Sequence, residues 1–271
     1  MTEVEYGALP GITASAIKAG RQSMAHMRHA MLRPRGEVGS PAMRIGTLAH
    51  RAILEPDRYA ESTVVWTGGN KRGKVYDAFS DMHACKDILS EAEASAIMAM
   101  RSAVMQDGDA ARLLADCTVF EYVAMFDGGT GVGACKARLD GCAGRGASGM
   151  LLDYKTTREI GKDGARFMRS AEGMGYSHQL AWYWLAMGKP SNVWIIAQES
   201  AAPYSVAVFW VPASALEPAL EECLDIARMY RVCEMTGHFP GPTRGVVTWE
   251  RPAWATGEQD MSNGTMEASE L

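Results

Sequence analysis

The sequence lacks the patterns that would place it in a membrane or build it around a metal cluster. No run approaches the roughly 18 consecutive apolar residues that a membrane-spanning helix requires. The N-terminus carries Glu3 and Glu5 and lacks the basic and apolar pattern of a signal peptide. The six cysteines show no C-x-x-C spacing, so neither a zinc knuckle nor an iron–sulfur cluster is indicated. We therefore expect a cytoplasmic protein.

An excess of positive charge is also absent, because the net charge is -5. This argues mildly against a protein that coats nucleic acid, but it says little about one that grips DNA locally. Between Lys18 and Arg51 seven basic residues stand against the single acid Glu37, and a second basic cluster occupies a glycine-containing loop at 71–74. Both clusters could equally be ordinary solvated surface. The candidate DNA contacts are Arg28, Arg33, Arg44, Lys71, Arg72 and Lys74.

Two aspartates and a lysine near the middle of the chain have the spacing of a catalytic site. Asp140 ends the sequence Arg-Leu-Asp, and thirteen positions later Asp153 begins Asp-Tyr-Lys. A strand over 151–155 would put Asp153 and Lys155 on one face. Carboxylates suit Mg²⁺, and a lysine can orient an attacking water, so the pattern indicates a metal-dependent phosphodiesterase site. A surface strand carrying both residues as solvated charges is the alternative.

A histidine on an amphipathic helix is the next candidate. Apolar residues at helical spacing predict a helix over about 43–54, with Gly46 and His50 as neighbours four positions apart. A glycine there costs the helix about 1 kcal/mol relative to alanine, which suggests that something approaches its backbone closely. A lone histidine beside an apolar stripe is, however, usually structural.

Two further polar groups lie within apolar elements. Gln179 and Tyr183 share one face of a helix expected over 176–187, although core packing with a polar edge would look the same. Glu121 lies in the strand-like run 119–126, where it could simply face outward.

Taken in order along the chain, these residues resemble the PD-(D/E)xK nuclease superfamily, in the branch that contains RecB-type and phage recombination exonucleases. The flanking sequences at 9–15, 46–50, 54–56 and 71–74 are similar to RecE, the exodeoxyribonuclease VIII family, and the resemblance covers about 9–240. Leu139 stands where a proline often precedes the first aspartate. The residues that occur in the order typical of the superfamily are His50, Glu121, Asp140, Asp153, Lys155, Gln179 and Tyr183.

The resemblance implies a role for each of these residues. His50, Asp140 and Asp153 would bind the metal together with the Tyr154 carbonyl, and Lys155 would be the catalytic lysine. The pair Gln179 and Tyr183 would position DNA or the lysine. Glu121 would lie near a second metal or merely near the sheet surface.

The same resemblance implies a Mg²⁺-dependent 5′ to 3′ exonuclease on linear double-stranded DNA, with Mn²⁺ as a substitute metal. Such an enzyme leaves 3′ single strands for an annealing protein of RecT type, and its family forms homo-oligomeric rings. Two other functions stay open. One is a PD-(D/E)xK endonuclease or a CRISPR-type end processor, and the other is a non-catalytic DNA-end binding recombination module.

We expect an α/β fold with a PD-(D/E)xK, restriction-endonuclease-like core, in which a mixed β-sheet is flanked by helices. One exonuclease domain would span 1–254, with a mainly helical N-terminal part at 9–115 and the nuclease core at 116–240. Strands are expected over 119–126, 132–140, 149–155, 192–198 and 204–211, and a long amphipathic helix over 216–235. The polar, glycine-bearing tail at 255–271 is expected to be disordered.

Overall fold

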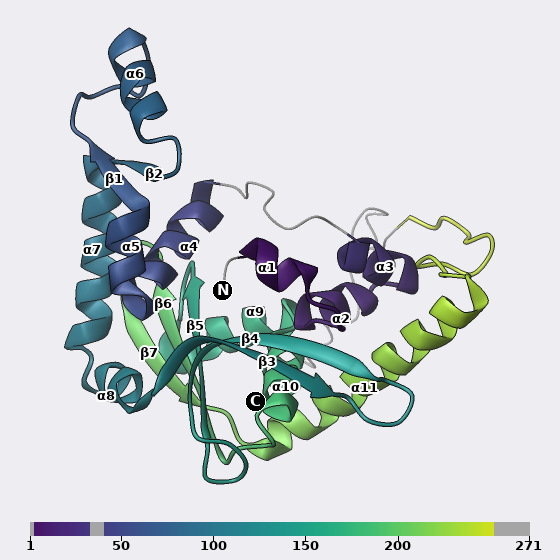
Figure 1. Ribbon diagram of the computed structural model, residues 1–271. Helices are drawn as coiled ribbons and strands as arrows, with labels where there is room; N and C mark the ends of the chain where they lie inside the picture. Colours follow the sequence, from purple (N-terminus) through teal and green to yellow (C-terminus); the bar gives the residue numbers. More distant parts are fainter. Residues whose placement is uncertain (1–2, 33–40, 252–271) are drawn as a thin grey trace, which may run out of the picture.

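A computed structural model describes residues 3–32 and 41–251 of the chain. A mixed sheet lies at its centre, with the strand order β3-β4-β5-β6-β7 (Figure 1). The pair β5 and β6 is parallel, and the other neighbouring strands are antiparallel. The strands are β3 (Val119–Asp127), β4 (Ala134–Ala143), β5 (Met150–Thr157), β6 (Asn192–Glu199) and β7 (Val206–Trp210).

Helices cover both faces of this sheet, which confirms the predicted fold class. The larger core cluster joins one face to α2, α3, α9, α10 and α11. A second cluster joins the opposite face to α4, α7 and α8. Their bounds are α2 (Ala14–Gly20), α3 (Met24–Leu32), α4 (Pro41–Leu54), α7 (Glu91–Gln106), α8 (Gly108–Asp116), α9 (Ala165–Gly173), α10 (Tyr176–Ala186) and α11 (Ala213–Thr236).

Strands β4 and β5 separate in the middle of the sheet. They pair only at Gly141–Ala143 of β4, so the half of β4 that precedes Gly141 has no partner in β5. Ile12 occupies part of this free edge through hydrogen bonds with Ala134 and Lys136. Asp140 lies at the point of separation, where its carboxylate accepts the Tyr154 N–H at 2.9 Å. The splay opens a wedge in which side chains of both strands can meet a substrate.

The hairpin between β3 and β4 turns at a glycine-rich run, 128–133. Asp127 caps this turn by accepting the Gly129 N–H, and Gly129, Gly131 and Gly133 all have positive φ. Left-handed backbone of this kind is readily adopted by glycine alone, so the run forms a turn. A dinucleotide-binding loop would instead lead into a helix.

Two helices in the N-terminal half begin at capping residues. Thr13 caps α2 by accepting the Ala16 N–H. Ser90 and Glu93 form a reciprocal capping box at the start of α7, as their spacing predicts. Such caps satisfy backbone donors that a helix leaves unpaired in its first turn.

An arm that the sequence did not predict stands out from the body beside α4 and α7 (Figure 1). It follows α5 (Pro56–Ser62) and consists of β1 (Thr63–Trp66), α6 (Lys74–Met82) and β2 (Asp87–Ser90), with β1 and β2 paired in parallel. The Trp66 ring packs on Tyr76 and Phe79 of α6, with ring centroids 5.5 and 5.0 Å away. Two four-residue strands give a weak periodicity signal, which explains why the sequence indicated only a loop here.

Some predictions concern parts of the chain outside the described residues. These are Arg33 and the tail at 255–271. Within the described part, no helix combines the length and apolarity that crossing a bilayer requires. All six cysteines are free thiols. The short elements α1 (Glu3–Ala8) and η1 (Lys162–Gly164) complete the described structure.

Candidate active site

Helix α4 places His50 over the wedge between β4 and β5. Gly46, one turn earlier, faces β5 so closely that an added Cβ would lie 2.9 Å from Thr156 Oγ1. The sequence suggested a close approach at this glycine, and the approaching group is a side chain of the protein itself. A residue without a side chain at position 46 thus lets α4 lie on β5 near enough for His50 to reach the wedge.

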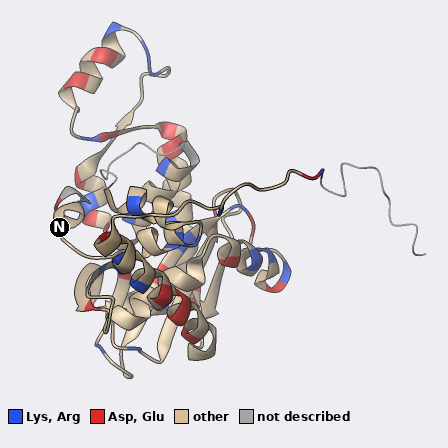
Figure 2. Ribbon diagram, turned by 90° about the vertical axis from the view of Figure 1, so that its right-hand side faces the viewer, with Lys and Arg blue, Asp and Glu red and all other residues tan. Residues whose placement is uncertain are grey.

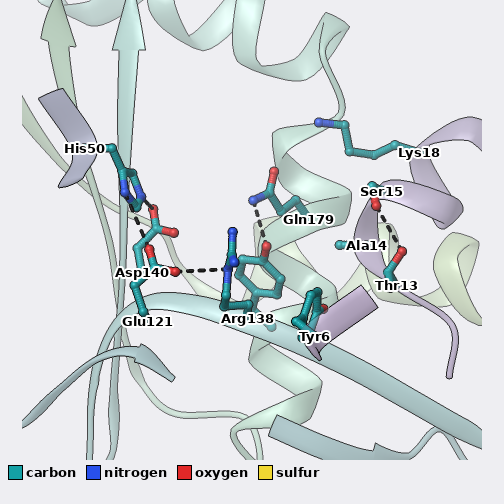
Figure 3. Close-up of a pocket in the computed structure, with 11 residues that line it drawn as sticks. Tyr6, Thr13, Ala14, Ser15, Lys18, His50, Glu121, Arg138, Asp140 and Gln179 are labelled. Carbon is teal, nitrogen blue, oxygen red and sulfur yellow. Dashed lines mark hydrogen bonds and ion pairs between the residues drawn. The ribbon is translucent and has the colours of Figure 1, made fainter. Parts of the chain in front are cut away.

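His50, Glu121 and Asp140 converge on one point, although they come from α4, β3 and β4 (Figure 3). Their nearest ligand atoms all lie within 4.8 Å of one another. The His50 imidazole lies 3.2 Å from Asp140 Oδ2 through Nε2 and 3.5 Å from Glu121 Oε1 through Nδ1. Two carboxylates and an imidazole at these separations form a donor set for a divalent cation.

Asp153 and Lys155 form the second half of the site. Both side chains lie on the same face of β5, where Lys155 Nζ is 2.5 Å from Asp153 Oδ2. Asp153 is 1% exposed, and its Oδ1 has no hydrogen-bond partner among the described residues. A buried carboxylate oxygen without a partner costs free energy unless a cation or another donor meets it. Tyr154 points to the opposite face, where its hydroxyl bonds Gln198 at 2.5 Å.

The pKa values of the two aspartates are shifted in opposite directions. Burial by itself would raise the pKa of Asp140, but the His50 side chain, the Lys155 ammonium and the Tyr154 N–H outweigh it and hold the pKa well below its usual range. Burial raises the pKa of Asp153, and the neighbouring Asp140 carboxylate adds to that effect against the attraction of Lys155. When two carboxylates share a buried site, the negative charge of one raises the pKa of the other. An additional cation would relieve this repulsion.

The neighbouring carboxylates raise the pKa values of both basic groups. Burial lowers the pKa of His50, but the Asp140 and Glu121 carboxylates outweigh it and leave the pKa above its usual value. Burial likewise opposes the charge on Lys155, while Asp153 and Asp140 raise its pKa. Lys155 is therefore an ammonium at neutral pH, which can donate hydrogen bonds and offset negative charge but cannot accept a proton.

Glu121 is held in an unusual backbone conformation. Its φ is +50°, in the left-handed region, although it lies within a strand. Such strain in a residue with a side chain costs on the order of 1–3 kcal/mol and persists where surrounding contacts impose it. One such contact is Arg138, whose Nε lies 3.0 Å from Glu121 Oε2. Burial and the Asp140 carboxylate raise the pKa of Glu121 against the pull of His50 and Arg138.

Gln179 and Tyr183 join the site from α10. The Gln179 amide donates to the Tyr183 hydroxyl at 3.0 Å, across one helical turn. Burial raises the pKa of Tyr183 well above its usual value, and Asp140 and Asp153 add to this. The hydroxyl is therefore a neutral group that can both donate and accept hydrogen bonds.

Two cavities meet at these residues. The first, which we call the inner cavity, has a volume of about 250 Å³ and appears in Figure 3. Its walls come from α1, α2 and α10 as well as from the candidate ligands His50, Glu121 and Asp140, which we call the metal-ligand cluster. It is lined by Tyr6, Thr13, Ala14, Ser15, Lys18, His50, Glu121, Arg138, Asp140, Gln179 and Tyr183.

The second, the outer cavity, has a volume of about 480 Å³ and includes the catalytic lysine candidate. His50, Arg138 and Gln179 line both cavities, so the two adjoin beside the metal-ligand cluster. The outer cavity is lined by Met43, Gly46, Thr47, His50, Arg138, Tyr154, Lys155, Thr156, Tyr176 and Gln179.

Four charged or aromatic residues that line the two cavities were not selected from the sequence. Arg138 lies two positions before Asp140. In a strand this spacing places both side chains on one face, so the sequence could have indicated that Arg138 lies near the site. Lys18 belongs to the basic segment but gave no sign that it lines the inner cavity. Tyr6 and Tyr176 had no signal, since a lone tyrosine is common in any core. The ammonium groups of Lys18 and Lys155 each lie 5.2 Å from the Tyr176 ring centroid.

The predicted DNA contacts fall into different settings. Arg44 and Lys71 both bind Glu93, each at 2.8 Å, and so tie α4 and the arm to α7. Arg28 lies over the Phe239 ring. The remaining described candidates, Arg72 and Lys74, are exposed on the arm. Figure 2 shows the arm projecting away from the body, with basic and acidic segments both on it.

Comparisons with known proteins agree with this geometry. A model of the family described as a PDDEXK-like domain of unknown function (DUF3799) matches residues 13–246. A crystal structure of a protein from Eubacterium rectale, described as a "putative exonuclease", is 12% identical and has a TM-score of 0.58 over 92% of this chain and 94% of that one. At that identity the likeness shows the fold, and no curated protein matches the sequence. The fold and the family together support a nuclease of the PD-(D/E)xK superfamily, and the chain belongs to the PDDEXK-like family DUF3799.

Proposed function

We propose that this protein is a Mg²⁺-dependent exonuclease that degrades linear double-stranded DNA from 5′ to 3′ and leaves 3′ single strands for recombination. The observation that carries the catalytic part is the convergence of His50, Glu121 and Asp140 beside the Asp153–Lys155 pair. Polarity and substrate rest on the sequence resemblance to RecE described above.

The residues present fit a divalent cation. The donor set contains two carboxylates and an imidazole, and Asp153 adds a buried oxygen that lacks a partner among the described residues. Mg²⁺ is usually bound by one or two carboxylates together with water and substrate phosphate, and Mn²⁺ accepts the same oxygen ligands. His50, Asp140 and Asp153 would hold the ion, with Glu121 beside them. A bound ion there would lower the pKa of a water and neutralise phosphate charge.

The protein's own groups would supply orientation and charge. Lys155 stays protonated, so it would donate to the attacking water or to a phosphate oxygen and offset charge that develops in the transition state. Arg138 would keep Glu121 in place, since it holds that carboxylate at 3.0 Å. Gln179 and Tyr183 line the same cavity and offer neutral hydrogen bonds, which suit them to position the phosphate or the lysine.

Digestion of linear duplex DNA tests the proposal. The DNA is labelled separately at its 5′ and 3′ ends, with covalently closed circular DNA as control, and wild type is compared with Asp153→Ala in Mg²⁺. We expect Mg²⁺-dependent loss of linear DNA from its 5′ ends alone, and none with the variant. Cutting of the circle by wild type would show an endonuclease instead, and binding without cutting would show the non-catalytic module.

The partners belong to the same proposal. A 3′ single strand is the substrate of an annealing protein of RecT type, so such a protein would act on the product. A homo-oligomeric ring would keep the enzyme on its DNA between cuts. Light scattering tests this part separately, because a strict monomer would exclude a ring while leaving the cleavage chemistry intact.

A further inference from the structure

Strand β4 carries three charged residues on one face, and only the last belongs to the metal-ligand cluster. Lys136, Arg138 and Asp140 alternate along the strand, so their side chains lie on the same side of it. Lys136 is 4% exposed, which is rare for a lysine and requires partners for its charge. Those partners lie in the N-terminal segment, which this face of β4 holds in place.

The Lys136 ammonium binds the end of the N-terminal helix α1. It donates to the carbonyl oxygens of Tyr6 at 2.8 Å and Gly7 at 3.2 Å, and also to that of Leu9. A cation at a helix C-terminus satisfies carbonyls that have no partner within the helix. A few residues later, Ile12 pairs with β4 through two backbone hydrogen bonds. The segment is therefore held to β4 by two independent sets of contacts.

This anchoring presses the Tyr6 side chain into the site. Tyr6 is 4% exposed, and Lys136 Nζ and the Arg138 guanidinium lie 4.9 and 5.6 Å from its ring centroid. Cations over an aromatic face hold it in place more firmly than apolar contact alone. Through Arg138 the ring adjoins Glu121, and so it forms the wall of the inner cavity next to the metal-ligand cluster.

The inner cavity is small. Its volume of about 250 Å³ lies below the roughly 300–1,000 Å³ of pockets that enclose drug-sized ligands. A DNA strand that enters through the outer cavity and crosses the cluster at His50 thus has room for at most about one nucleotide, itself a group of drug size, before it meets α1 and α2. Tyr6 lines the end of the inner cavity at α1, so a DNA strand that continued past α1 would have to displace the Tyr6 ring.

We propose that α1, anchored by Lys136, is a stop that closes the inner cavity and makes the site require a DNA end. The inference rests on the proposed exonuclease function. It adds that α1 would impose the requirement for a DNA end within a single subunit. The stop also sets the length of the product, because the DNA strand can advance past the metal-ligand cluster only as far as Tyr6. Wild type should therefore release mononucleotides.

Two variants open the stop in different ways. Tyr6→Ala removes the wall but keeps the anchor, because Lys136 binds backbone carbonyls. Deletion of residues 1–8 removes α1 altogether. Ala8→Ser, on an exposed position of the same helix, is the matched control. Thermal unfolding shows which proteins are folded, so that Tyr6→Ala stands if the deletion does not fold.

The measurements are product length from linear duplex DNA and cutting of covalently closed circles, single-stranded and double-stranded, in Mg²⁺. We expect Tyr6→Ala and the deletion to gain circle cutting and to release products longer than one nucleotide, while Ala8→Ser behaves as wild type. A folded Tyr6→Ala protein that leaves circles intact with unchanged products would overturn the stop. So would one that loses digestion of linear DNA, since Tyr6 would then serve substrate binding. If wild type digests no linear DNA, the proposed function itself fails.

Discussion

Lys155 Nζ lies 2.5 Å from Asp153 Oδ2, while Asp153 Oδ1, on a side chain only 1% exposed, has no hydrogen-bond partner among the described residues. The pair is thus charged, buried and incompletely satisfied. Groups left in this state lower stability, and they commonly mark a site that is completed by a ligand. This relationship motivates the first prediction.

Asp153→Asn should reduce DNA cleavage by about 10²–10³-fold, the typical cost of removing one preorganised electrostatic group from an active site. The amide keeps the shape of the carboxylate, so the fold should persist. Initial rates of linear duplex digestion and the thermal midpoint are the two measurements. The control is Asp116→Asn, an exposed carboxylate at the end of α8, and near-wild-type turnover by Asp153→Asn would remove Asp153 from the mechanism.

Glu121→Gln should weaken divalent-cation binding by about 10- to 100-fold, the cost typical of losing a group that supports a metal site. The amide cannot match the carboxylate charge toward a cation, although it can still accept a hydrogen bond from Arg138. Calorimetric titration with Mn²⁺ measures the change, with the exposed Glu217→Gln as control. Unchanged affinity would place Glu121 outside the metal site, and metal binding would then not account for its strained backbone.

Gly46→Ala should lower activity because the new Cβ would lie 2.9 Å from Thr156 Oγ1 and move α4, and with it His50. The gain of about 1 kcal/mol in helix propensity opposes this steric cost. Thr156→Ala removes the clashing oxygen, so the double variant should recover much of the lost activity. A double-mutant cycle of rates and of unfolding free energies measures the coupling, and additive effects would contradict the contact.

Glu93 should make stability depend on acid pH. Burial opposes its charge, but the Lys71 ammonium and hydrogen bonds from Ser90 lower the pKa of Glu93 to about 2. Because the folded pKa lies below the unfolded value of about 4.3, Glu93 stabilises the fold above that pH and loses its contribution as the pH falls toward 2. Its side chain is partly exposed, so we expect about 0.5–2 kcal/mol, the usual range for a cap.

The measurement is urea unfolding of wild type and Glu93→Gln at pH 7 and pH 3. The difference between the two proteins should be larger at pH 7 than at pH 3. Glu91→Gln, an exposed acid in the same first turn, serves as the control. An equal difference at both values would show that packing rather than charge carries the effect.

Arg72 and Lys74 should contact DNA phosphates if the arm lies along the duplex. Replacing both with alanine should weaken binding and reduce the slope of log K against log salt concentration by about 2, since each phosphate contact contributes roughly 0.9. Anisotropy titrations of the Asp153→Ala protein, in which no cleavage is expected, measure this at several salt concentrations. Lys86→Ala, also exposed on the arm, is the control, and an unchanged slope would separate the arm from DNA binding.

Much of the scaffold follows from local pattern. The hairpin glycines, the Ser90–Glu93 capping box and the strand carrying Asp153 are set by residues close together in the sequence, and periodicity and capping reveal them. The arm was missed because its strands have only four residues each, and α1 because it has six. Elements this short owe their structure to tertiary contacts such as those of Trp66 and Lys136.

The sequence by itself determined which chemical groups are available, and a histidine, three carboxylates and a lysine in this order predict a metal-dependent site. Only the tertiary structure decided how they meet. Glu121 joins His50 and Asp140 because β3 pairs with β4 and α4 lies close on β5, and these are contacts between residues far apart in the chain. The same long-range packing brings Tyr6 beside Arg138 and makes the first helix a wall of the site. No local pattern encodes such a meeting, because it depends on the free energy of the whole fold.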